Sequence, residues 1–180
     1  MILDATAGNR MLWINKESDN IIYIDRQTEL AVKPTLFCDN RQTPFKDKTF
    51  DTIIFDPPHD IRGRDGFFSH PSGESYNKFY KKSREIPTYY GAELFKTKIE
   101  LLRYIYEAQI EFQRTLKDDG LLWLKWCDMQ IQLYRIISMF DNWKLLMQIK
   151  ADQPTHIYKQ NKTYWLCMEK LKSDKIQQTL

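Results

Sequence analysis

The sequence has few cysteines, little net charge and no long apolar run, and each shortage excludes a class of protein. Its cysteines, Cys38, Cys127 and Cys167, stand in or beside apolar segments without metal-site spacing, so we expect reduced, buried thiols, no metal and a cytoplasmic protein. The formal net charge of +3 is too small to argue for nucleic-acid binding by itself. No apolar stretch has membrane-spanning length and the first residues predict a strand, which argues against a membrane partner and a signal peptide.

The chain is short and its composition is ordinary. A length of 180 residues predicts one domain over residues 1–180, without a separate domain for target recognition. Hydrophobic residues make up 42% and charged residues 28%, as in common globular proteins. The aromatic share of 14% is high, which fits stacking on nucleic-acid bases as well as core packing.

Four short apolar segments in the first third of the chain end in acidic residues. Because the carboxyl ends of parallel strands meet at one edge of an open α/β sheet, we expect these acidic side chains to line one ligand crevice. A single acidic residue would fit an ordinary turn or helix cap, but four in register favour a nucleotide-like ligand. The segments are Met1–Asp4, Asn20–Asp25, Leu36–Asn40 and Asp51–Asp56.

The residues that follow the first segment are small. Ala5, Ala7 and Gly8 would let the backbone come close to a ligand, and helical spacing resumes over 11–14. The sequence therefore predicts a strand, a tight turn and a helix, an order that is typical of nucleotide-binding sites.

The fourth segment ends in Asp56-Pro-Pro-His59. Two prolines stop sheet pairing and stiffen the chain after the strand, so Asp56 and His59 are expected to project into the crevice. Proline after a strand is also ordinary turn chemistry, and a lone histidine there is more often a turn residue. No serine–histidine–aspartate or metal-hydrolase arrangement is supported by the sequence.

Asp56-Pro-Pro-His59 resembles the D/N-P-P-aromatic signature of S-adenosylmethionine-dependent methyltransferases that modify exocyclic amino groups of nucleic-acid bases. With the acidic strand ends before it, the segment resembles motifs I to IV of the class I methyltransferases. Segments such as Leu124-Lys-Trp126 and Lys162–Met168 are similar to small methyltransferases of phages and prophages, and this similarity covers nearly the whole chain. The resemblance implies a Rossmann-like α/β fold with a seven-stranded, mostly parallel sheet and an antiparallel last strand.

The resemblance also assigns an S-adenosylmethionine site. It places Asp4 and the small-residue turn beside the amino-acid part of the cofactor, Asp25 on the ribose and Asp39 near the adenine amine. Arg10 would pair with the cofactor carboxylate, and a surface salt bridge is the alternative. Gly8-Asn-Arg10 replaces the usual Gly-x-Gly, and an amino-terminal cofactor-covering element is expected to be missing. The predicted cofactor-binding residues are Asp4, Ala5, Thr6, Ala7, Gly8, Asn9, Arg10, Asp25, Asp39, Asn40 and Asp56.

The catalytic residues that the resemblance implies are Asp56, Pro57, Pro58 and His59. The Asp56 side chain and the Pro57 carbonyl would accept the hydrogens of the target amine, and His59 would stack on the flipped base. The leading target is adenine N6 in DNA, with DNA favoured over RNA as the partner. An RNA base, a small-molecule amine, a catalytically silent nucleic-acid-binding subunit and a homodimeric assembly are left open. No cysteine stands at this site, which argues against methylation of cytosine ring carbon.

Between residues 60 and 95 the apolar periodicity disappears. A Gly- and Ser-rich stretch predicts a loop, and the aromatic and basic residues after it suit a flipped or single-stranded nucleotide. We interpret this insertion as a substrate lid; a solvated lid over tucked aromatics is the alternative. Two residues at the end of a later strand would join the target pocket, although Trp126 fits the core equally well. The predicted substrate-binding residues are His59, Tyr76, Lys78, Tyr80, Lys81, Lys82, Arg84, Lys125 and Trp126.

The remaining sequence predicts helices over 96–117 and 129–140 and strands over 121–125, 143–149 and 163–168. The last two strands are expected to pair as an antiparallel hairpin. Residues 118–120, Asp-Asp-Gly, are expected to form the turn that ends the first helix.

Overall fold

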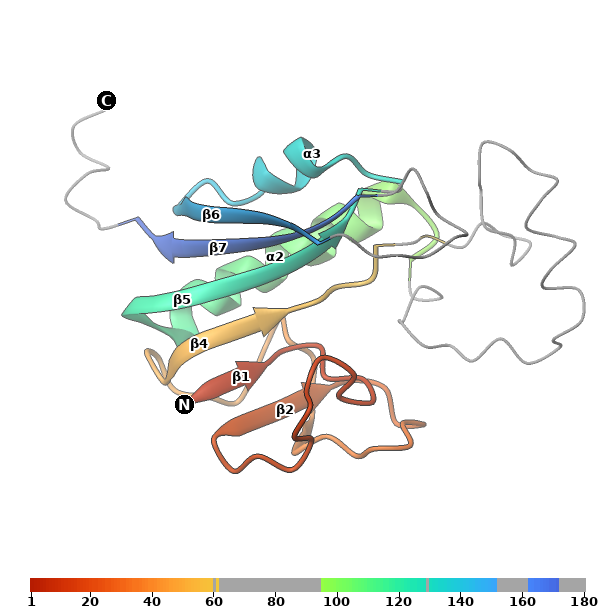
Figure 1. Cartoon of the computed structure of the whole chain (residues 1–180), viewed down its shortest axis with the longest axis vertical. Coiled ribbons are helices and arrows are strands. Elements are labelled where there is room, and N and C mark those ends of the chain that lie inside the picture. Colours follow the sequence, from red (N-terminus) through yellow and green to blue (C-terminus); the bar gives the residue numbers. More distant parts are fainter. Residues whose placement is uncertain (60, 62–94, 129, 152–161, 172–180) are drawn as a thin grey trace, which may run out of the picture.

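A computed structural model of the chain describes residues 1–59, 61, 95–128, 130–151 and 162–171. These residues form one seven-stranded sheet with the strand order β3-β2-β1-β4-β5-β7-β6 (Figure 1). Neighbouring strands pair in parallel except at β7, which is antiparallel to both β5 and β6. The predicted Rossmann-like α/β fold with its antiparallel last strand is confirmed. The elements are β1 (Ile2–Asp4), β2 (Ile21–Asp25), β3 (Leu36–Phe37), β4 (Phe50–Phe55), α2 (Lys98–Thr115), β5 (Leu116–Cys127), α3 (Leu133–Ile137), β6 (Trp143–Ala151) and β7 (Thr163–Lys170).

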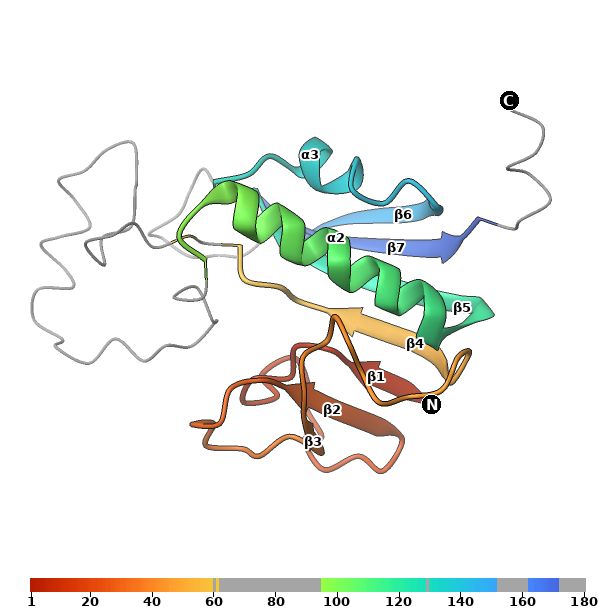
Figure 2. The ribbon, with the colours of Figure 1, turned by 180° about the vertical axis from the view of Figure 1, so that it is seen from behind.

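Helix α2 covers one face of the sheet, where it runs across β4 and β5 (Figure 2). It begins after Thr97, whose hydroxyl accepts a hydrogen bond of 3.2 Å from the backbone N–H of Glu100. The buried side chains Leu101, Ile105 and Phe112 recur at helical spacing and belong to the main hydrophobic core. The helix thereby fixes the face of the sheet on which the core lies.

Strand β5 alternates between the two faces of the sheet. Leu122, Leu124 and Trp126 are fully buried, and the residues between them are partly exposed. The chain passes from α2 into β5 without an intervening loop, because α2 ends at Thr115 and β5 begins at the next residue.

The turn predicted at residues 118–120 is wrong, because these residues lie inside β5. The register between β4 and β5 shifts at this point, as it does where a strand carries a bulge. A Cβ atom at Gly120 would lie 2.7 Å from the Leu116 side chain and 3.0 Å from the Asp51 carbonyl oxygen. Gly120, which suggested a turn, therefore allows β4 and β5 to approach closely at this position.

Two predicted helices also differ from the structure. The residues after Gly8 form turns rather than the helix predicted from Met11, and the side chains of Met11 and Ile14 are exposed. Of the helix predicted over 129–140, the described residues form only the short α3. Within the described part of the chain, none of the helices combines the length and the apolar character that a membrane span requires.

Candidate functional site

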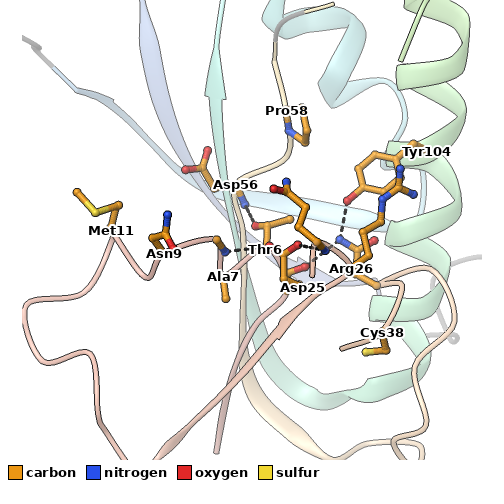
Figure 3. Close-up of a pocket in the computed structure, with 14 residues that line it drawn as sticks. Thr6, Ala7, Asn9, Met11, Asp25, Arg26, Cys38, Asp56, Pro58 and Tyr104 are labelled. Carbon is orange, nitrogen blue, oxygen red and sulfur yellow. Dashed lines mark hydrogen bonds between the residues drawn. The ribbon is translucent and has the colours of Figure 1, made fainter. Parts of the chain in front are cut away.

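A pocket opens at the carboxyl edge of the sheet, between the loops that follow β1, β2, β3 and β4 (Figure 3). Strands β2 and β3 lie on one side of β1, and β4 lies on the other side. The loops after these strands therefore diverge next to β1 and leave a crevice. The pocket is open to solvent, and backbone and polar groups from four loops converge on it. Its lining residues are Ala5, Thr6, Ala7, Gly8, Asn9, Met11, Asp25, Arg26, Gln27, Cys38, Asn40, Asp56, Pro58 and Tyr104.

Hydrogen bonds hold the loop after β1 against the ends of β2 and β4. The backbone N–H of Gly8 donates to Asp25 Oδ2 at 2.9 Å, and Thr6 Oγ1 accepts from the backbone N–H of Asp56 at 2.8 Å. Gly8 has a φ of +48°, a left-handed conformation that glycine adopts without steric strain. The small side chains of Ala5 and Ala7 are buried, so the backbone itself forms this wall of the pocket.

Asp25 is both a pocket residue and a loop anchor. Its Oδ2 accepts from Gly8, and its Oδ1 accepts from the backbone N–H of Gln27 at 2.8 Å. A carboxylate can accept about four hydrogen bonds, so Asp25 retains capacity for hydroxyl groups of a ligand.

Asp4 lies beneath the loop and does not line the pocket. Its side chain accepts from Trp13 Nε1 at 2.6 Å and from the backbone N–H of Thr6 at 3.2 Å. Burial raises the pKa of Asp4 to about 6, although the hydrogen bond from Trp13 lowers it. This predicted cofactor residue therefore supports the loop rather than facing the cavity.

Arg10 points away from the pocket and does not line it. This position argues against the predicted contact of Arg10 with a cofactor carboxylate. The buried guanidinium donates to the carbonyl oxygens of Lys16 and Lys33, the latter at 2.6 Å, and lies 4.0 Å from the ring centroid of Tyr23. It also contacts Glu17 Oε1 at 3.3 Å, an ion pair weaker than the carbonyl contacts. Arg10 has a φ of +56° inside a turn, so its side chain leaves on the far side of the loop.

Asp39 and Asn40 have different environments. Hydrogen bonds from the guanidinium of Arg41, at 2.9 and 2.7 Å, hold the pKa of Asp39 below its usual value, and the carboxylate does not line the pocket. Asn40 is buried in the pocket wall, and its amide nitrogen donates to the Ala5 carbonyl at 2.9 Å and to the Tyr104 hydroxyl at 2.6 Å. The Asn40 Oδ1 atom is buried and has no hydrogen-bond partner among the described residues. Asn40, rather than Asp39, therefore lines the pocket, and it carries a buried acceptor without a partner among the described residues.

Asp56 stands where β4 ends, on the same pocket. Its Oδ2 atom accepts from Lys125 Nζ at 2.9 Å, and the two side chains are only 8% and 17% exposed. The Oδ1 atom is buried without a hydrogen-bond partner in the described part of the chain. Since a buried carboxylate oxygen without a donor is costly, this atom marks a place for a ligand donor. Pro57 and Pro58 are buried behind it, and Pro58 lines the cavity.

His59 and Trp126 pack against each other, with ring centroids 6.2 Å apart and planes at 77°. Trp126 is fully buried and donates from Nε1 to the Ile131 carbonyl at 2.9 Å, so of its two predicted roles the core position is correct. Burial lowers the pKa of His59, which keeps the imidazole neutral at pH 7. Neither ring lines the pocket. Trp126 is buried, so the prediction that it contacts the substrate is wrong.

Sequence reasoning missed several pocket residues. Tyr104 comes from α2, and burial raises the pKa of its hydroxyl. Arg26 and Gln27 directly follow Asp25, the last residue of β2. Their position after a strand that ends at the crevice could have predicted that they line the pocket. Tyr104 lies far from the acidic strand ends in sequence, and only the docking of α2 on the sheet brings it to the cavity.

The predicted substrate residues Tyr76, Lys78, Tyr80, Lys81, Lys82 and Arg84 lie outside the described residues. The described residues that flank this segment, Ile61 and Phe95, are both buried in the main core. Residues 1–59 and the other described ranges contain no group of three or more histidine, cysteine or acidic side chains that would hold a metal ion.

No protein-family model and no curated protein matches this sequence. Among solved structures, the chain is similar to the PH0226 protein from Pyrococcus horikoshii OT3, with 11% sequence identity and a TM-score of 0.56. The similarity covers 94% of this chain and 81% of that chain. At this level of identity the similarity concerns the fold, and it agrees with the Rossmann-like sheet.

Proposed function

We propose that this protein transfers a methyl group from S-adenosylmethionine to an exocyclic amino group of a nucleic-acid base, with adenine N6 in DNA as the leading target. The observation that carries the proposal is Asp56, a residue of the pocket wall with a buried carboxylate oxygen that has no hydrogen-bond partner among the described residues. The Asp56-Pro-Pro-His59 motif and the four acidic strand ends support the same assignment. A cytoplasmic location follows from this proposal.

The residues of the pocket fit the cofactor. The backbone over residues 5–8 would lie along its amino-acid part, Asp25 would accept hydrogen bonds from the ribose, and the Asn40 Oδ1 atom would accept from the adenine amine. The fit rests on the small side chains of the loop, the spare acceptor capacity of Asp25 and the buried Oδ1 atom of Asn40. When bound, S-adenosylmethionine would supply an electrophilic methyl carbon, and its sulfur would keep the electron pair of the broken bond.

Asp56 would activate the amine. An amine that is conjugated with a base ring is a poor nucleophile, because its lone pair is delocalised. When Asp56 Oδ1 and the Pro57 carbonyl accept hydrogen bonds from its two N–H groups, the nitrogen becomes more tetrahedral and its lone pair becomes available for bonding. Once nitrogen has bonded to the methyl carbon, it would release one proton to Asp56 Oδ1. Lys125 Nζ donates to Asp56 Oδ2 and leaves Oδ1 for the amine, and fixed positions supply the remaining advantage through proximity.

The test is the Asp56→Ala variant, in which we expect methyl transfer to be abolished and the affinity for S-adenosylmethionine to change by no more than a few-fold. Transfer is measured with tritiated cofactor on DNA, RNA and protein pools, followed by mass spectrometry of nucleosides. Cofactor affinity is measured by isothermal titration. Asp51→Ala, which removes an exposed carboxylate from the other end of β4, is the matched control.

The assignment fails if the Asp56→Ala variant loses cofactor affinity and keeps its transfer rate. If the parent protein binds S-adenosylmethionine but modifies only small amines, the substrate is a small-molecule amine and not a nucleic-acid base. A parent that binds no S-adenosylmethionine would favour the silent subunit.

A further inference from the structure

The carboxyl end of β4 holds an ion pair that is more enclosed than a similar pair at the other end of the same two strands. Lys125 and Asp56 are 17% and 8% exposed, whereas Lys117 and Asp51, also paired between β5 and β4, are 41% and 51% exposed. Asp56 lines the pocket, and the ion pair holds Lys125 beside it. Removing two charges from water is costly, so a pair this enclosed differs from an ordinary surface ion pair.

The pair presents a hydrogen-bond donor next to an acceptor. Lys125 has three N–H donors and directs one of them to Asp56 Oδ2 at 2.9 Å. Asp56 Oδ1 is the buried acceptor without a partner in the described structure. A ligand group that meets both residues must therefore donate to Asp56 and accept from Lys125.

We infer that Lys125 is a specificity-determining residue that restricts the target to a neutral, conjugated amine with a hydrogen-bond acceptor on the adjacent ring atom. In adenine the N6 amine donates, and the neighbouring N1 atom accepts. The inference rests on the proposed methyl transfer. It adds that Lys125 recognises the ring atom beside the reacting amine.

The same pair disfavours aliphatic amines. An aliphatic amine has a pKa near 10 and is a cation at pH 7, so its attraction to Asp56 would be offset by repulsion from the Lys125 ammonium. It also carries no adjacent ring acceptor for that donor. The exocyclic amine of a base is neutral and meets both requirements.

The experiment compares oligonucleotides in which the target adenine is replaced by 1-deazaadenine, which lacks the N1 acceptor, or by 7-deazaadenine, which keeps it. In the parent protein we expect 1-deazaadenine to be methylated roughly tenfold to a hundredfold more slowly, the range for a lost hydrogen bond to a charged group. The 7-deazaadenine substrate should react within a few-fold of adenine.

The Lys125→Met variant completes the comparison, because methionine keeps an unbranched stem without a donor. This variant should methylate adenine slowly and show little further loss on 1-deazaadenine, since the partner of N1 is already absent. The ratio between two substrates is measured within one protein, so a reduced folded fraction cancels. Lys125→Arg, which retains a cationic donor, should keep part of the discrimination.

An equal penalty for 1-deazaadenine in the parent and in Lys125→Met would overturn the inference and leave methyl transfer intact. If the methylated base proves to be cytosine, 3-deazacytosine takes the place of 1-deazaadenine with the same expected pattern. Absence of transfer to any nucleic-acid base would instead overturn the proposed function, and the inference with it.

Discussion

The two halves of the sheet are built in different ways. The strands that surround the pocket, β1 to β4, have 3, 5, 2 and 6 residues, whereas β5, β6 and β7 have 12, 9 and 8. The loops that join the short strands are held by hydrogen bonds of Asp4, Arg10 and Asn40, all of them buried. Strands β5 and β7 place Leu122, Leu124, Leu166 and Met168 in the main hydrophobic core, whereas β6 is mostly exposed.

This difference implies that different residues determine stability and ligand binding. A polar network that is fully hydrogen-bonded fixes positions closely, but it adds little net stability for each bond. Apolar burial is less directional and stabilises the fold in proportion to the area removed from water. We therefore expect changes in the long-stranded half to alter the free energy of unfolding, and changes around the pocket to alter binding and pH dependence.

The largest expected effect is that of Phe112→Ala in α2. Phe112 is fully buried, with its ring centroid 4.9 Å from that of Phe55, so truncation leaves a cavity between helix and sheet. We expect the free energy of unfolding to fall by about 3–5 kcal/mol, measured by urea denaturation. Ile110→Ala on the exposed side of the same helix is the control and should cost less than about 1 kcal/mol. Equal effects of the two substitutions would mean that the burial of Phe112 adds little to stability.

Asp4→Asn should remove a pH dependence of stability. The pKa of Asp4 is about 6 in the folded protein and 3.8 in the reference state, so the folded protein binds the proton more tightly. The stabilisation from that proton is complete below pH 3.8 and is lost as the pH rises through 6. A shift of this size corresponds to roughly 3 kcal/mol, since one pKa unit is about 1.4 kcal/mol.

Asparagine cannot ionise, and its single oxygen can replace only one of the two carboxylate oxygens that accept from Thr6 and Trp13, a loss that is the same at every pH. Between pH 4 and pH 7 the unfolding free energy of the variant should therefore rise relative to that of the parent. Parallel curves of stability against pH for the two proteins would mean that Asp4 titrates normally.

A smaller effect is expected from Asp25→Ala on cofactor affinity. The substitution removes charge-assisted hydrogen bonds to ribose, worth about 1.5–3 kcal/mol, and it also frees the Gly8 end of the loop. Isothermal titration with S-adenosylmethionine should show a tenfold to hundredfold rise in the dissociation constant. Glu29→Ala, an exposed carboxylate on the following loop, serves as the control. An unchanged dissociation constant would reduce Asp25 to a loop anchor.

The sheet could be predicted from the sequence because its signal is local. Each strand is an apolar run, and the acidic residue at the end of β1, β2 or β4 stands directly next to that run. The same locality explains why Ala5, Asp25 and Asp56 were correctly expected near one crevice.

The errors arise where distant residues decide the structure. Arg10 turns away from the pocket because its partners include the carbonyl of Lys33, which is 23 residues further along the chain. Gly120 reads as a turn in sequence, yet it is required by the approach of Asp51 from another strand. Tyr104 reaches the cavity only because α2 docks on the sheet. The methyltransferase activity itself stays a prediction, and the insertion predicted at 60–95 lies almost entirely outside the described residues.

The position of β7 has a consequence for the order in which the chain folds. Strand β6 pairs with the sheet through β7, and β7 also pairs with the edge of β5 opposite β4. A ribosome makes β7 after both of its neighbours, so that edge of β5 stays unpaired and β6 has no sheet to join until the last strand emerges. The pocket strands need no such delay and are complete when β4 leaves the ribosome. Nascent chains that stall before β7 would expose the unpaired backbone N–H and C=O groups along that edge of β5, the type of edge that chaperones cover and that otherwise promotes aggregation.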